Sequence, residues 1–139
     1  MRRREDWPGR LDEVVRGALG RPFAWGQHDC ALFACDACHA MTGVDPAAAV
    51  RGKYKTAKGA ARAIKRLFGA GSLPALATTT LGAPQAAELA RRGDIACVQT
   101  ERGPALGVVL GQWAAYPGPA TLTFVPIEKA RACWPLGWG

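Results

Sequence analysis

The sequence predicts an α+β protein in which helices come first and an antiparallel sheet follows. Up to about residue 80 the apolar residues recur at helical spacing, whereas beyond Arg92 they fall in short runs separated by turns rich in glycine and proline. Segregated halves of this kind are typical of α+β folds rather than of alternating α/β folds. The 139 residues are expected to form one domain, 1–139, whose core is large enough to need neither metal nor disulfide.

Four helices are expected in the first half, and the second is the most sharply bounded. Asp29 is a good N-cap residue and Gly43 follows the last helical position, so Cys30 occupies the first position of that helix. The expected helices span 6–19, 30–42, 56–68 and 73–80.

Four strands are expected in the second half, followed by a short helix. Gly93-Asp94 turns into the first strand, and glycine–proline turns separate the others. The expected strands span 95–100, 105–110, 113–116 and 121–125, and the final helix spans 127–132. A tail that carries Trp134 and Trp138 closes the chain.

The formal net charge of +7 gathers in an arginine run at the N-terminus and in residues 51–66. A basic patch can bind a polyanion, but no DNA or RNA motif accompanies this one. We therefore favour a solvated helix face and expect no specific nucleic-acid partner.

The chain is expected to start in a cytoplasm and to have no membrane span. The N-terminal charges precede no apolar segment of the kind found in a secretory signal, and no apolar run approaches the ~20 residues that a span requires. In that compartment the five cysteines are expected to be free thiols.

Cys30 is the candidate nucleophile, because the start of a helix favours the thiolate. A cysteine nucleophile needs a base, and His28 lies two residues before it. His28 has two possible roles: it activates the thiol, or it structures the loop through a hydrogen bond to the backbone. His39 is half a turn out of phase with Cys30 and about 13 Å along the helix, so we do not expect it to be the base.

Cys30, Cys35 and Cys38 have the spacing of a plant-type ferredoxin site. That pattern normally wraps a cluster in a loop, whereas here it falls on one continuous helix. Since the three positions do not share a helix face, we expect no metal and no cofactor.

Three motifs in order resemble the NlpC/p60 papain-like cysteine peptidases. Trp25-Gly26 followed by Asp29-Cys30 resembles their nucleophile motif, 92–95 resembles their strand entry, and 105–111 resembles the strand that carries their histidine. The resemblance implies a papain-like fold of N-terminal helices packed on a small antiparallel sheet. It also implies that Cys30 is the nucleophile and that Asp29 caps or orients its helix.

A closer likeness covers most of the chain and points to a family of unknown function from phage and prophage tail regions. The matching segments are 22–33, 42–46, 51–54 and 92–94, with Trp134 near the end. The likeness implies a tail-tip or tail-assembly protein that has other tail-tip proteins as partners. Such a protein would reside in the host cytoplasm during assembly and then at the tail tip of the virion.

The position of the peptidase's catalytic histidine falls on Ala105, and no histidine occurs after residue 39. Alanine has no titratable group, so activity is expected to be weak or absent. Two interpretations remain: a structural tail-tip component on a degenerate peptidase scaffold, which we favour, or an active cysteine hydrolase. The hydrolase would cleave peptidoglycan peptides during phage entry, with Cys30 as nucleophile and His28 as base.

Overall fold

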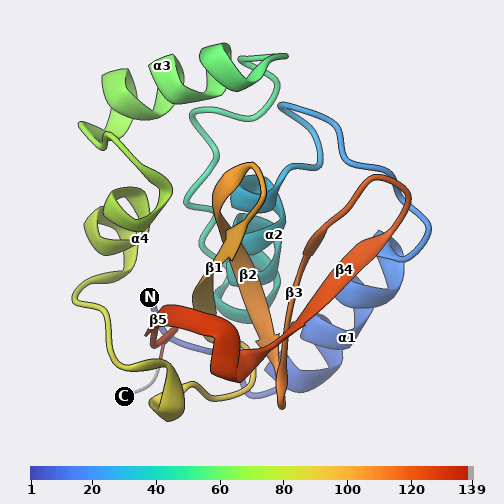
Figure 1. The fold of residues 1–139 in the computed structure, drawn as a ribbon. Helices are drawn as coiled ribbons and strands as arrows, with labels where there is room; N and C mark the ends of the chain where they lie inside the picture. Colours follow the sequence, from blue (N-terminus) through green and yellow to red (C-terminus); the bar gives the residue numbers. More distant parts are fainter. Residues whose placement is uncertain (138–139) are drawn as a thin grey trace.

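A computed structural model describes residues 1–137, in which four α-helices precede a five-stranded antiparallel sheet (Figure 1). The α+β prediction is therefore confirmed. The α-helices are α1 Trp7–Ala18, α2 Cys30–Thr42, α3 Ala57–Phe68 and α4 Leu73–Leu81, and a 3-10 turn η1 spans Ala87–Leu89. The strands are β1 Ile95–Thr100, β2 Gly103–Leu110, β3 Trp113–Pro117, β4 Leu122–Pro126 and β5 Ala130–Trp134, with a 3-10 turn η2 at Ile127–Lys129. Among residues 1–137, no helix has the length and apolar character needed to cross a membrane.

The prediction of a final helix over 127–132 is wrong. Only η2 is helical there, and β5 pairs antiparallel with β1 to give the strand order β4-β3-β2-β1-β5. The unpaired edge of β1 offers backbone partners, and pairing places Trp134 at 1% exposure in the core. These tertiary contacts outweigh the helical preference of an alanine-containing stretch. The expected contribution of Trp138 lies outside the described residues.

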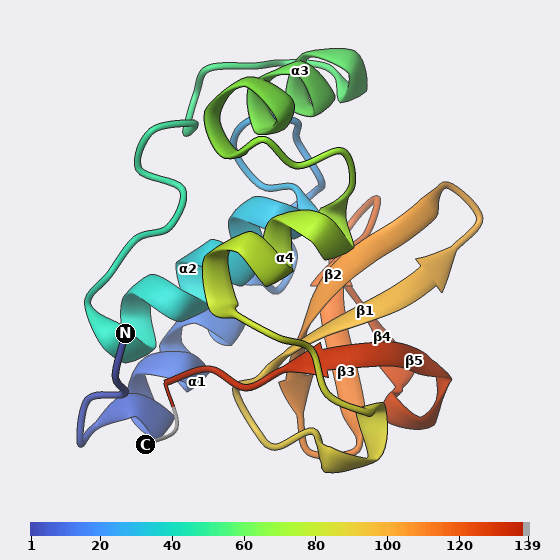
Figure 2. The same ribbon diagram turned by 90° about the vertical axis from the view of Figure 1, so that its left-hand side faces the viewer.

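Helix α2 is central because it is apolar on almost every side. It packs on β2 and β3 on one side and on α1 on another (Figure 2). Seven of its thirteen residues are buried. The main core contains Phe33, Ala37 and Met41 of α2 together with Ile95, Val108 and Trp134.

A buried ion pair joins the two ends of the chain at the start of β1. The Arg3 guanidinium donates to the Asp94 carboxylate at 2.9 Å and to the Leu136 carbonyl oxygen at 2.6 Å. The Asp94 carboxylate also accepts from the backbone N–H groups of Leu136 and Arg91 at 3.0 and 2.9 Å. The side chains of Arg3 and Asp94 are only 4% and 1% exposed, so neither charge has water as an alternative partner.

We predict that Arg3→Met lowers the free energy of unfolding by about 3 kcal/mol, because it removes one partner of a buried, hydrogen-bonded ion pair. Urea unfolding followed by circular dichroism measures the change. Arg10→Met is the matched control, since the Arg10–Asp6 pair has side chains that are 41% and 64% exposed. An equal loss in both variants would contradict a special role for the buried pair.

Candidate functional site

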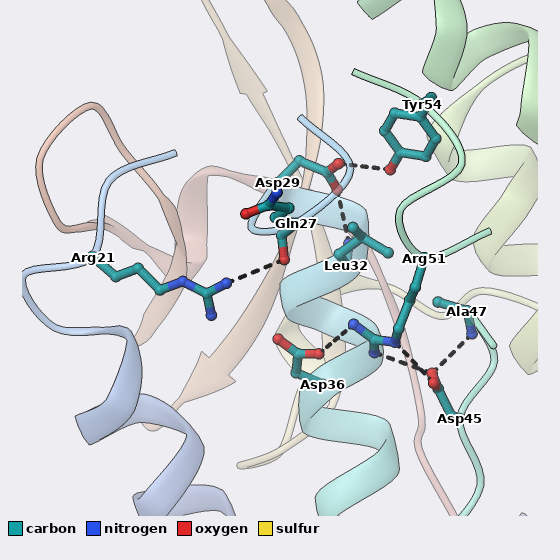
Figure 3. Close-up of polar contacts among 9 residues, drawn as sticks. All are labelled: Arg21, Gln27, Asp29, Leu32, Asp36, Asp45, Ala47, Arg51 and Tyr54. Atoms are coloured by element: carbon teal, nitrogen blue, oxygen red, sulfur yellow. Dashed lines mark hydrogen bonds and ion pairs between the residues drawn. The ribbon is translucent and has the colours of Figure 1, made fainter. Parts of the chain in front are cut away.

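The start of α2 is built around the carboxylate of Asp29 (Figure 3). One oxygen accepts from the Leu32 backbone N–H at 2.9 Å, which is the expected helix cap. The other oxygen accepts from the Gly26 backbone N–H at 3.0 Å and from the Tyr54 hydroxyl at 2.6 Å. Asp29 is 1% exposed, so its carboxylate oxygens need hydrogen-bond donors from the protein. Three donors from three segments supply these hydrogen bonds.

Gly26 lies where the loop before α2 touches the segment that leads to α3. Its carbonyl oxygen accepts from the Gly52 backbone N–H at 3.0 Å, and its φ is +80°. A Cβ at this position would collide with the Tyr54 carbonyl oxygen. Only glycine fits both the conformation and the close approach.

Arg51 holds the same segment against α2 from the other side (Figure 3). Its guanidinium donates twice to the Asp45 carboxylate, at 2.8 and 3.1 Å, and lies 2.7 Å from the Asp36 carboxylate. Hydrogen bonding from Arg51 lowers the pKa of Asp45. In the sequence, Tyr54 was matched only as part of a likeness and Arg51 also as one charge of the basic stretch 51–66, and neither was given a role at this site. The sequence did offer one signal for these contacts. Arg51 and Tyr54 lie in a short linker that follows Asp29 and Asp45, the carboxylates that they contact.

Cys30 is the first residue of α2, as expected, and packs against the apolar cluster that includes Ala105 of β2. Burial raises the pKa of the Cys30 thiol to about 11; the Leu106 backbone N–H opposes this shift and the Asp29 charge adds to it. Loss of solvation on burial thus acts against the thiolate that the helix start is expected to favour.

His28 is buried at 1% exposure, and among the described residues neither of its ring nitrogens has a hydrogen-bond partner. Its ring instead packs edge-on against Phe33, with ring centres 5.8 Å apart. Burial lowers the pKa of His28, and the Arg21 charge adds to the shift, so the imidazole is neutral at pH 7. The hydrogen bond to Cys30 that a general base uses is not formed, and neither is a ring hydrogen bond to the loop backbone.

The loop that carries His28 is closed by its own backbone. Ala24 and His28 exchange two backbone hydrogen bonds, at 3.0 and 2.8 Å. His39, in contrast, is exposed on α2.

The other cysteines do not converge with Cys30. All five are free thiols. Cys30, Cys35 and Cys38 pack in three different apolar clusters, and burial raises the pKa of Cys35 to about 12. Within residues 1–137, no group of three or more His, Cys, Asp or Glu side chains is placed to hold a metal ion.

These features define an α+β protein with a cysteine at a helix start that faces an antiparallel sheet. The chain belongs to the family described as a domain of unknown function, DUF6950, whose model matches residues 2–136. None of the curated proteins compared with the chain matches it.

We predict that Gly26→Ala destabilises the protein by about 3 kcal/mol, since it adds a collision with the Tyr54 carbonyl oxygen to the cost of a left-handed residue. Gly20→Ala is the matched control: its φ is +76°, but nothing lies within 4 Å of the added Cβ. The control should lose only about 1 kcal/mol. Chemical denaturation of both variants measures the difference, and equal losses would show that the contact with Tyr54 does not matter.

We also predict that alkylation of Cys30 by iodoacetamide is slow at pH 7.5 and accelerates up to about pH 11, because the thiolate is the reacting form and burial disfavours it. Peptide mapping by mass spectrometry assigns the modified residue. A plateau in rate below pH 8 would mean that the helix dipole prevails over burial.

Proposed function

We propose that this chain is a structural tail-tip component of a phage, built on a papain-like NlpC/p60-type scaffold that no longer performs peptidase chemistry. The observation that carries the proposal is that Cys30 packs against the apolar cluster that contains Ala105. In a peptidase of this type, the position of Ala105 holds the histidine that takes the proton from the thiol.

The arrangement of elements supports the papain-like part of the proposal. A cysteine begins the helix that packs on β2 and β3. The first two strands form an antiparallel hairpin in which Val98 pairs with Ala105. The packing of Cys30 against the cluster that contains Ala105 supports the assignment of these two positions to the nucleophile and the base of a peptidase.

The chemistry around Cys30 supports the loss of activity. Ala105 supplies no base, His28 forms no hydrogen bond with the thiol, and burial keeps Cys30 protonated at pH 7. General acid–base catalysis typically contributes about 10²–10⁴ in rate, so a site without a base retains little. The tail-tip setting and the partnership with other tail-tip proteins rest on the likeness of 22–33, 42–46, 51–54 and 92–94 to the tail-region family.

We predict that the wild-type chain cleaves purified peptidoglycan fragments poorly and that Cys30→Ala leaves tail assembly and infectivity intact. Cys35→Ala is the matched control, a second half-buried cysteine on the same helix. Chromatography of the released peptides measures cleavage, and plaque counts with electron microscopy of tails measure assembly. The opposite outcome is robust cleavage by the wild type, with cleavage and infectivity both lost in Cys30→Ala while tails still assemble. That outcome would establish the active peptidoglycan hydrolase instead.

Ala105→His tests the scaffold separately. A histidine there should raise cleavage by up to about 100-fold if the old geometry persists, since it restores the base. Ala105→Leu controls for added bulk, circular dichroism checks folding, and the gain must vanish when Cys30→Ala is added. A folded Ala105→His protein with no gain would remove the papain-like assignment of this pair.

A further inference from the structure

The whole net charge of the protein resides in one part of it. Residues 46–87 hold seven basic residues and no acidic residue, so the rest of the chain, with 11 of each, is neutral. Arg51 is paired with Asp36 and Asp45. The other six are exposed and, within the described part of the chain, form no ion pair; they are Lys53, Lys55, Lys58, Arg62, Lys65 and Arg66. We call these six residues the basic lobe.

Helix α3 carries four members of the basic lobe on the outside of the molecule. Figures 1 and 2 place α3 at one end, away from the sheet. Its inner face, with Ala60, Ala63 and Ile64, packs against residues at the start of α2 and in α4. The outward side borders an open trough of about 720 Å³ whose charged lining is Lys53, Arg62, Lys65 and Arg66. The trough therefore presents a single sign of charge.

The spacing of these charges works against the helix that carries them. Lys58, Arg62 and Arg66 follow one another at intervals of four residues, which brings like charges together on one side of α3. Each such pair costs a helix a few tenths of a kcal/mol, whereas an acidic residue at the same spacing would be favourable. A merely solvated face would gain from alternating signs. The same arrangement is favourable when a polyanion covers it.

We infer that the basic lobe binds the phosphate backbone of double-stranded DNA without regard to sequence, an activity beyond the proposed tail-tip role. From Lys58 to Arg66 the helix rises about 12 Å, which spans about three phosphates of one strand. Single strands are recognised by stacking on aromatic side chains, and the two aromatics of 46–87 are Tyr54, which is buried, and Phe68, which is partly buried. A protein partner is less suitable, because an acidic protein surface usually carries basic residues as well. Residues 46–87 contain no carboxylate that could pair with those basic residues.

Fluorescence anisotropy of the full chain with a labelled duplex of about 20 bp, titrated across salt concentrations, tests the inference. The triple variant Lys58→Gln, Arg62→Gln, Lys65→Gln should reduce the slope of log K against log salt by about 2.7 and weaken binding roughly 100-fold at about 0.15 M salt. Its thermal midpoint should not fall, because the substitutions relieve repulsion on α3 and glutamine is a good helix former.

The matched control removes the same charge elsewhere, through Arg16→Gln, Arg102→Gln and Lys129→Gln, three exposed residues outside 46–87. It should bind the duplex within about threefold of wild type, since distant exposed charges are screened. Equal weakening by the two triples would overturn the inference in favour of diffuse charge. Equal binding of a single strand, or equally effective competition by poly-glutamate of the same charge, would also overturn it.

Discussion

The structure depends first on the buried carboxylate of Asp29. Taking a carboxylate out of water is costly unless its oxygens are satisfied, and here the donors come from the loop before α2, from α2 itself and from the segment that precedes α3. One side chain thus fixes where α2 begins, how the chain turns at Gly26 and where Tyr54 lies. Tyr54 and Arg51 hold the segment that leads into α3, and Tyr54 does so through its hydrogen bond to Asp29. The position of the basic lobe therefore depends on Asp29 as well. The Asp94 carboxylate likewise connects the two ends of the described chain, because it accepts hydrogen bonds from Arg3 and from Leu136.

The same carboxylate has an electrostatic consequence for Cys30. A helix start attracts negative charge because its first N–H groups are unpaired, and that attraction is the usual reason for a reactive cysteine there. Here Asp29 already accepts from the Leu32 N–H and places its own charge beside the sulfur. The thiol also packs against the apolar side chains around Ala105. The cap that builds the helix and the packing that stabilises it therefore both oppose the thiolate.

Local patterns in the sequence predicted most of the fold. Asp29 and Gly43 bound α2 at the expected residues because capping is a local interaction. The last strand was missed because β5 forms through backbone pairing with distant segments, chiefly with β1, more than thirty residues earlier, and also with Gln85. Distance along the chain likewise hid the Arg3–Asp94 pair and the Tyr54–Asp29 hydrogen bond. The raised pKa of Cys30 could not be predicted from the sequence either, because it results from burial in the assembled core.

The residues that resemble a peptidase motif each have a structural task that requires no catalysis. Gly26 makes a turn that only glycine permits, Asp29 joins three segments, and Cys30 is a small apolar side chain in a cluster with Ala105. These structural tasks account for the residue types at the three positions without any catalytic role. Ala105, the position that the resemblance assigns to a base, is 7% exposed on β2 and belongs to the apolar cluster against which Cys30 packs.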